Sequence, residues 1–79
     1  MTRYLIQCFH QFEWKKYMYW NSDKREYDVY TFMDYDIYAA FVKLDELSKS
    51  ESGAFRIYDM LEDKPLHIIS INGEQYVKI

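Results

Sequence analysis

MDYDIYAAFVKLDELSKS, residues 33–50, contains the one sustained helical period in this sequence. Apolar side chains recur in it at spacings of three and four residues, which places them on one face of a helix. We expect that face to be buried in the core of the protein. Its residues are Ile37, Ala40, Phe41, Leu44 and Leu47.

Polar and charged residues mark both ends of this helix. Asp34 is the expected N-cap, or Thr31 caps the helix with Asp34 as a partial capping box. Asp36 then lies near the positive end of the helix dipole. Asp45 and Lys49 are four residues apart and predict a stabilising ion pair. The polar residues that follow predict that the helix ends near Lys49.

A second apolar stripe lies on the same helix, roughly 100 to 200 degrees around the axis from the first. Two interpretations of it are open. Either a sheet and a loop of the same domain cover it, or its tyrosines form a surface that binds a partner. The stripe consists of Tyr35, Tyr38, Ala39 and Val42.

The length of 79 residues predicts one domain, residues 1–79. A domain of this size buries only about 60% of the surface that its unfolded chain exposes, so its core must be thin. Nine Tyr, five Phe and two Trp, with only two Gly and one Pro, exclude a disordered or low-complexity chain. We therefore expect the chain to fold.

Cysteine count and charge bear on the cellular location and on the class of partner. Cys8 is the only cysteine, which excludes an internal disulfide framework and fits a reducing compartment. We find no signal peptide or membrane-spanning segment, and expect a cytoplasmic protein without membrane contact.

The net charge is −3, but residues 1–25 carry five basic and two acidic groups (+3), and residues 26–79 carry five basic and eleven acidic groups (−6). Binding of nucleic acid therefore remains a candidate function only for the basic part of the chain, residues 1–25.

Residues 3–9 predict a central strand, because both of its faces are apolar and a central strand is covered on both sides. A helix over residues 3–19 is the competing interpretation, although the density of aromatic residues lowers its helix propensity. The strand places Tyr4, Ile6 and Cys8 on one face and Leu5, Gln7 and Phe9 on the other.

Residues 13–20 and 25–32 flank a polar turn at residues 21–24, a pattern typical of an antiparallel hairpin. One face of this hairpin holds both tryptophans, and we expect it to be buried: Trp14, Lys16, Met18, Trp20, Arg25, Tyr27, Val29 and Thr31. The opposite face predicts an outward ladder of tyrosines among charges: Glu13, Lys15, Tyr17, Tyr19, Glu26, Asp28, Tyr30 and Phe32.

The C-terminal part predicts a strand at residues 54–61 with Phe55 and Ile57 inward, a turn at 62–65 and a hairpin over 66–79. A short helix is the alternative to the strand, because Phe55, Tyr58 and Leu61 also fit one helical face. Asn72-Gly73 between two alternating runs tolerates positive φ at both central positions of a type I′ turn. The expected core face of this hairpin is Leu66, Ile68, Ser70, Gln75, Val77 and Ile79; the other is His67, Ile69, Ile71, Glu74, Tyr76 and Lys78. The order of strand, hairpin, helix, strand, hairpin predicts an α+β fold, a small antiparallel sheet with one helix packed across it.

No catalytic, metal or cofactor site is expected. Cys8 and His10 would point the same way on a strand, but a lone pair of this kind arises readily by chance. His67 is the only other histidine, and paired zinc-ligand spacing is absent. No glycine-rich phosphate loop is present. A non-enzymatic protein is therefore expected.

The favoured hypothesis is a protein-binding module, because exposed tyrosines give rigid, amphipathic contact area at low entropy cost. An inhibitor or adaptor acting on a host protein, as in some phage-encoded antagonists, has this general character, and a homodimer through the same patch is a further arrangement. The candidate contact residues are Tyr17, Tyr19, Tyr30, Tyr35, Tyr38 and Val42.

The alternative hypothesis is binding of single-stranded RNA or DNA by the hairpin at residues 13–32, which combines stacking surfaces with positive charge. Glu26 and Asp28 on the tyrosine face oppose it, because they would lie beside the phosphates. The candidate residues are Trp14, Lys15, Lys16, Trp20, Lys24 and Arg25.

Overall fold

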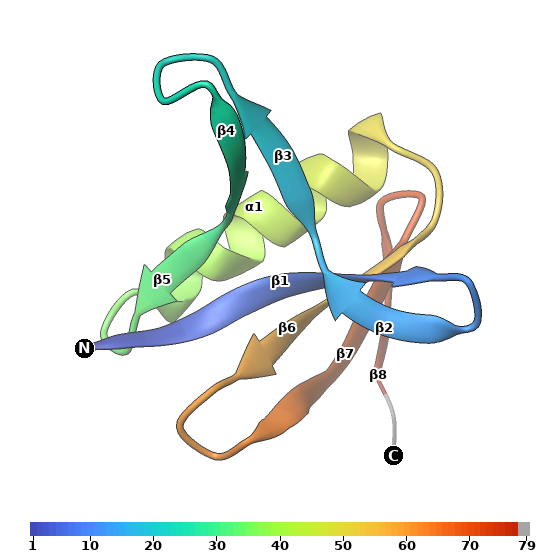
Figure 1. Cartoon of the computed structure of the whole chain (residues 1–79). Coiled ribbons are helices and arrows are strands. Elements are labelled where there is room, and N and C mark those ends of the chain that lie inside the picture. The colour runs from blue at the N-terminus through green and yellow to red at the C-terminus, as the bar shows by residue number, and fades with distance from the viewer. Residues whose placement is uncertain (78–79) are drawn as a thin grey trace.

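One helix, α1 (Ile37–Ser50), lies across one face of an antiparallel sheet in the computed structural model, which describes residues 1–77 (Figure 1). The predicted α+β architecture is confirmed. The main path of the sheet runs in the order β2 (Glu13–Lys16), β1 (Thr2–His10), β6 (Ala54–Asp59), β7 (Lys64–Ile71) and β8 (Glu74–Val77). A short strand, β5 (Thr31–Met33), also pairs with β1, and β3 (Met18–Asn21) and β4 (Glu26–Val29) form a separate two-stranded sheet.

β1 is the central strand, as the apolar character of both its faces predicts. It pairs with β6 along one edge and with β2 and β5 along the other. Tyr4 and Ile6 are buried toward the helix, and Leu5 is buried although it points to the opposite face. The competing interpretation, a helix over residues 3–19, is wrong.

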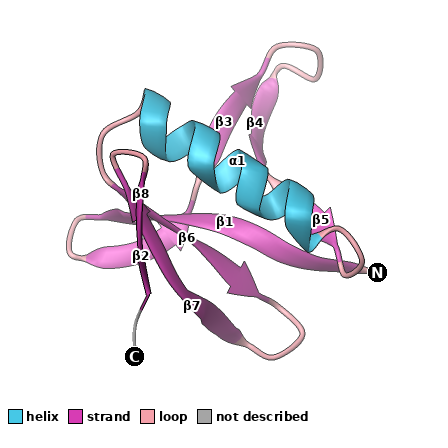
Figure 2. Ribbon diagram, turned by 180° about the vertical axis from the view of Figure 1, so that it is seen from behind, coloured by secondary structure: helices cyan, strands magenta, loops and turns pink. Residues whose placement is uncertain are grey.

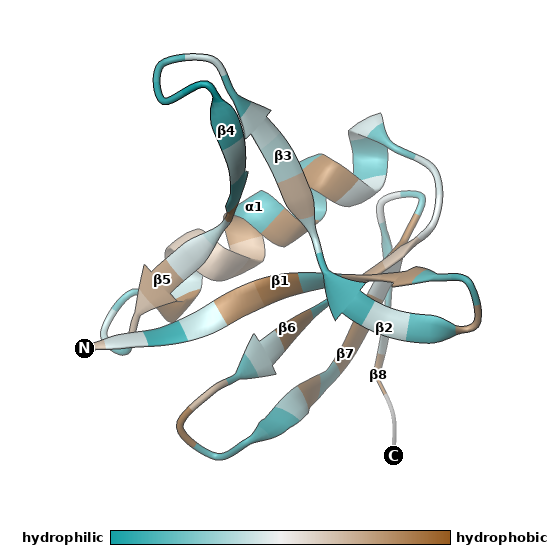
Figure 3. Ribbon diagram, in the orientation of Figure 1, coloured by the Kyte–Doolittle hydropathy of each residue, from teal (hydrophilic) through white to brown (hydrophobic). Residues whose placement is uncertain are grey.

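The core lies between α1 and the sheet. Figure 3 shows hydrophobic residues along the middle of β1 and on the helix that covers it. Ala40, Leu44 and Leu47 are buried as predicted, and Phe41 packs against them. Ile37 is a correction, because it lies in the first turn of the helix and is 38% exposed. The sheet contributes Tyr4, Ile6, Phe55 and Ile57.

The helix begins two residues later than predicted, because its N-cap is Asp36 and not Asp34. Thr31 pairs with Leu5 as part of β5, so it cannot cap a helix, and the backbone N–H of Asp34 donates to the carbonyl of Met1 at 3.0 Å. Asp36 takes the N-cap position without a side-chain capping hydrogen bond. At the other end the helix stops at Ser50, one residue beyond the prediction, and the Lys49–Asp45 ion pair is confirmed at 2.8 Å.

The predicted hairpin of residues 13–32 is divided into two parts. Residues 13–16 pair with β1 as β2, and only β3 and β4 pair with each other across the turn. The turn itself is confirmed, since Asn21 Oδ1 accepts from the backbone N–H groups of Asp23 and Lys24 at 3.1 and 3.3 Å. A long two-stranded ribbon does not form because residues 13–16 and 31–33 both pair with the same edge of β1, at its two ends.

The strand at residues 54–59 has Phe55 and Ile57 inward, as predicted, and the Asn72-Gly73 hairpin is also confirmed. Asn72 has φ 52° and Gly73 has φ 83°, and Ile71 pairs with Glu74. On the expected core face, Ser70 is buried and Leu66 packs against the core. Gln75 and Val77 were expected in the core, but both are exposed. They lie on the edge strand β8, whereas α1 packs chiefly on β1, β5, β6 and β7. Lys78 and Ile79 lie outside the described residues.

Ser48 of α1 holds the tip of this hairpin against the helix. Its Oγ accepts a hydrogen bond from the backbone N–H of Gly73 at 2.6 Å and another from Ser70 Oγ at 3.0 Å. Ser48 and Ser70 are both buried, so each hydroxyl satisfies the other in the core. The turn is therefore fastened to the helix as well as set by its own backbone conformation.

Gly73→Val is expected to lower the free energy of unfolding by more than about 1 kcal/mol, because a β-branched residue is strained at positive φ. A Cβ there would lie 2.9 Å from Lys49 Cγ, but that side chain is flexible and can move aside. Urea unfolding would measure the change. Gly73→Asn is the matched control, since asparagine tolerates this conformation and should lose much less. Equal stability of wild type and Gly73→Val would contradict the turn geometry.

Candidate functional site

The outer side of α1 carries a solvent-exposed apolar surface. Tyr35 is 80%, Tyr38 79% and Val42 41% exposed, and we call these three residues the tyrosine face. Figure 2 shows α1 in front of the sheet, with no described strand across its outer side. Of the two interpretations of this stripe, coverage by the same domain is therefore wrong.

The fold positions the tyrosine face through both ends of its segment. Ala40 and Leu44 are buried on the inner side, which fixes the rotation of the helix and directs Tyr38 and Val42 outward. Tyr35 lies in the turn before the helix, where the backbone N–H of Asp36 donates to the carbonyl of Met33 at 3.0 Å. The three side chains are thus held by a packed helix and a hydrogen-bonded turn.

The surroundings of the tyrosine face are acidic. Asp34 and Asp36 are exposed on either side of Tyr35, and residues 33–42 contain no Lys or Arg. Farther along the helix the basic groups are neutralised, because Lys43 pairs with Glu46 at 3.0 Å and Lys49 pairs with Asp45 at 2.8 Å. The surface therefore offers aromatic area in a negative field.

The predicted outward ladder of Tyr17, Tyr19 and Tyr30 is wrong. The rings of Tyr19 and Tyr30 stack with centroids 4.2 Å apart, and Tyr17 and Tyr30 lie parallel at 6.1 Å. Lys43 Nζ of α1 lies 4.8 Å from the centroid of the Tyr30 ring, and Tyr17 and Tyr30 pack against the core. The β3–β4 hairpin turns this face toward the helix, so the three tyrosines are half-buried.

The opposite face of the hairpin, expected in the core, is instead exposed. Trp20 is 56% and Tyr27 64% exposed, and their rings meet edge to face at 5.3 Å. Met18 beside them is also exposed. Sequence reasoning missed this cluster because both faces of the hairpin alternate aromatic with charged residues, so the pattern contains no signal that distinguishes them.

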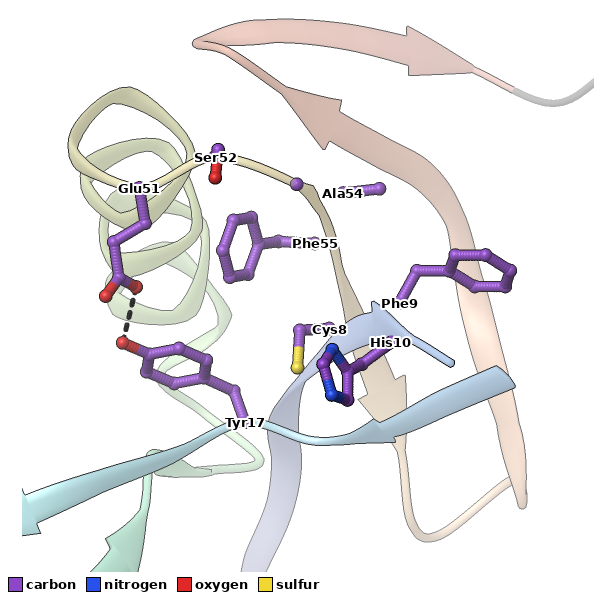
Figure 4. Close-up of a pocket in the computed structure, with 9 residues that line it drawn as sticks. Cys8, Phe9, His10, Tyr17, Glu51, Ser52, Ala54 and Phe55 are labelled. Atoms are coloured by element: carbon purple, nitrogen blue, oxygen red, sulfur yellow. Dashed lines mark hydrogen bonds between the residues drawn. The ribbon is translucent and has the colours of Figure 1, made fainter. Parts of the chain in front are cut away.

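A pocket of about 400 Å³ brings Cys8 and His10 together with Tyr17 and Phe55 (Figure 4). Tyr17 Oη donates to the Glu51 carboxylate at its rim. Burial, together with this hydrogen bond, raises the pKa of Tyr17. Burial also raises the pKa of the Cys8 thiol, whereas a nucleophilic cysteine needs a lowered pKa. Cys8 and His10 thus line the same pocket, and burial disfavours the thiolate form of Cys8.

The residues of the nucleic-acid hypothesis do not gather on one surface. Trp14 lies against Arg56 on the sheet face away from α1, with Arg56 Cζ 4.3 Å from its ring centroid. Trp20 lies on the β3–β4 hairpin, and Arg25 in its turn has φ 55°. Two of the lysines interact with other side chains: Lys15 Nζ donates a hydrogen bond to Gln11 Oε1 at 3.0 Å, and Lys24 forms an ion pair with Asp28 at 3.3 Å. Lys16 is exposed on β2.

Within residues 1–77, no group of three His, Cys, Asp or Glu side chains is placed to hold a metal ion. No helix of the described part of the chain has the length and apolar character to cross a membrane. Comparison with protein-family models, with curated proteins and with solved structures found no match. The geometry of the surfaces is therefore the basis for assigning a function.

Proposed function

We propose that the protein is a non-enzymatic binding module that docks on a protein partner through the tyrosine face and acts in the cytoplasm as an inhibitor or adaptor. One observation carries this proposal. Tyr35 in the turn before α1 and Tyr38 on the outer side of α1 expose 80% and 79% of their surface, whereas Ala40, Leu44 and Leu47 are buried on the inner side. Aromatic side chains that remain in water do not stabilise a folded monomer. In a binding surface the same side chains bury apolar area against the partner.

The chemistry of the tyrosine face indicates the kind of surface that it fits. Tyrosine loses little conformational entropy on binding and combines an apolar ring with a polar hydroxyl. Asp34 and Asp36 beside Tyr35 favour a partner with basic groups around an apolar patch. The same negative field repels a polyanion, which favours protein over nucleic acid at this surface.

Tyr17, Tyr19 and Tyr30 are not part of the proposed contact surface, because their rings are committed to one another and to the core. Val42 remains part of it as the apolar centre next to Tyr38. If the partner is a second copy of the chain, the two tyrosine faces contact each other about a twofold axis in a homodimer.

Tyr35→Ala combined with Tyr38→Ala is expected to abolish capture of the partner while leaving the fold intact. Aromatic anchors commonly lose about 2 kcal/mol or more on truncation, which is about 30-fold in affinity. The free energy of unfolding should change by less than about 0.5 kcal/mol for each exposed residue. Capture from a nuclease-treated host lysate, followed by titration of the captured protein, measures the binding, and urea unfolding measures the stability.

The matched control is Trp20→Ala combined with Tyr27→Ala, which removes two exposed aromatic side chains from the β3–β4 hairpin. This control should bind the captured protein like the wild type. Binding that survives loss of Tyr35 and Tyr38 but not loss of Trp20 and Tyr27 would overturn the assignment of the contact surface. Sedimentation of the wild type and both variants would identify a homodimer, which only the Tyr35/Tyr38 variant should dissociate.

A further inference from the structure

The sheet face away from α1 contains a cleft of about 260 Å³. Strands β2 and β7 both line it, although β1 and β6 lie between them in the sheet. Long side chains from non-neighbouring strands therefore meet above the sheet, as Arg56 Cζ does at 4.3 Å from the centroid of the Trp14 ring. The lining includes Trp14, Arg56, Lys64, Pro65, His67 and Ile69.

Arg56 is held in a defined orientation at this cleft. Its Nε donates to Gln7 Oε1 at 2.7 Å, and its Cζ lies 4.3 Å from the centroid of the Trp14 ring. The side chain therefore has its stem, its inner nitrogen and one face of its plane engaged. The Nη1 and Nη2 atoms make no hydrogen bond to residues 1–77 and present the forked end of the guanidinium, which matches the two oxygens of a carboxylate.

No carboxylate of residues 1–77 forms an ion pair with the cations of this cleft. Its lining contains Arg56 and Lys64 but no Asp or Glu. Arg3, by contrast, is neutralised by Asp59 at 3.0 and 2.8 Å. Burial lowers the pKa of Arg56, as expected for a partly desolvated cation with no carboxylate beside it.

Exposed apolar side chains surround the cleft on the same face. The Phe9 ring meets that of Trp14 edge to face at 5.4 Å, and Tyr76 lies opposite Ile69 in the β7–β8 ladder. Ile71 follows two residues after Ile69 on the same side of β7. Phe9, Ile71 and Tyr76 are all exposed. A ligand that places an anionic group on Arg56 would therefore find apolar area on either side.

We propose that this Arg56 cleft binds an acidic side chain of a partly apolar peptide segment in a partner protein. The volume of about 260 Å³ fits one such side chain and lies below the roughly 300–1,000 Å³ typical of cofactor and nucleotide pockets. The flanking apolar residues then bind the neighbouring residues of the peptide. The cleft lies on the side of the sheet opposite to the tyrosine face. This proposal rests on the proposed function only in taking the ligand to be a protein.

The test uses a pentapeptide Leu-Glu-Leu-Glu-Leu with acetylated and amidated ends, titrated into isotope-labelled protein and followed by NMR. The side-chain N–H signals of Arg56 and Trp14 should shift, and the matched Leu-Gln-Leu-Gln-Leu peptide should bind at least about tenfold more weakly, because a neutral amide gains no charge-assisted pair. Arg56→Lys should weaken binding at least about fivefold, since an ammonium group lacks the planar fork.

Three controls make the outcome decisive. Lys24→Gln removes a cation from the distant hairpin turn and should bind the peptide like the wild type. Lys64→Gln, at the rim of the cleft, should weaken binding and replaces Arg56→Lys if that variant does not fold. The Tyr35→Ala/Tyr38→Ala variant should bind the peptide normally, which separates this site from the tyrosine face. Equal binding of the two peptides would overturn the proposal, and so would tighter, Arg56-dependent binding of an eight-nucleotide oligothymidylate.

Discussion

Leu44→Ala is expected to lower the free energy of unfolding by about 2–5 kcal/mol, the range for removing a fully buried leucine and leaving a partly collapsed cavity. Leu44 has no exposed surface and lies in the cluster formed with Ile6, Ala40 and Ile57. In a chain of 79 residues the core is thin, so neighbouring side chains have few ways to fill the space. Urea unfolding monitored by circular dichroism gives the free energy for the variant and the wild type.

Val42→Ala is the matched control on the same helix, because Val42 lies on the outer side and is 41% exposed. It also removes methyl groups from a helical position but should lose less than about 1 kcal/mol, since Val42 keeps 41% of its surface in contact with water in the folded chain whereas Leu44 keeps none. Similar losses at positions 42 and 44 would mean that both sides of the helix are buried. The tyrosine face would then be an internal surface, and the proposed docking site would not exist.

Tyr17→Ala is expected to lower the free energy of unfolding by about 2–4 kcal/mol, slightly below the range for a fully buried aromatic residue. The Tyr17 ring meets Phe55 edge to face at 5.6 Å and stacks on Tyr30 at 6.1 Å, and its hydroxyl donates to Glu51. The backbone N–H of Tyr17 also donates to the carbonyl of Ile6 at 3.0 Å. The side chain thus joins Phe55 of β6, Glu51 at the end of α1 and Tyr30 directly after β4, while its backbone joins β1.

Two further variants separate the contributions of the Tyr17 ring and hydroxyl. Tyr17→Phe keeps the ring contacts and removes only the hydrogen bond to Glu51, so it should lose about 0.5–1.5 kcal/mol. Tyr27→Ala removes an exposed tyrosine of the same hairpin and should change stability by less than about 0.5 kcal/mol. If Tyr17→Ala were as stable as Tyr27→Ala, the hairpin would not pack against the helix as described.

Local periodicity was sufficient to predict most of the secondary structure. The spacing of Ala40, Leu44 and Leu47 predicts both a helix and its buried side, because the helical repeat alone places them together. Asn72-Gly73 predicts a hairpin with Ile71 opposite Glu74, because the turn conformation sets the pairing of the strands on either side. The exposure of Tyr35 and Tyr38 was one of two predicted alternatives, and the tertiary structure selected it.

The orientation of the β3–β4 hairpin could not be obtained in this way. Both of its faces alternate aromatic and charged residues, so the alternation shows that two faces exist without showing which one meets α1. The outcome depends on the crossing at Tyr17, where the chain leaves the main sheet after Lys16 and the hairpin that follows brings the centroid of the Tyr30 ring to 4.8 Å from Lys43 Nζ of α1. That crossing turned Tyr19 and Tyr30 inward and left Trp20 in water, the reverse of the expectation from residue type.

The Arg56 cleft depends on tertiary structure still more strongly. Trp14 and Arg56 are 42 residues apart in the chain, and no local pattern relates them. They meet because β1 pairs with both β2 and β6, and both side chains are long enough to reach across it on the face away from α1. Short-range sequence patterns therefore determined the helix, the strands and the turns of this protein. Which surfaces face water, and which distant side chains share a cleft, was determined by long-range strand pairing, whose energy depends on contacts that no segment makes alone.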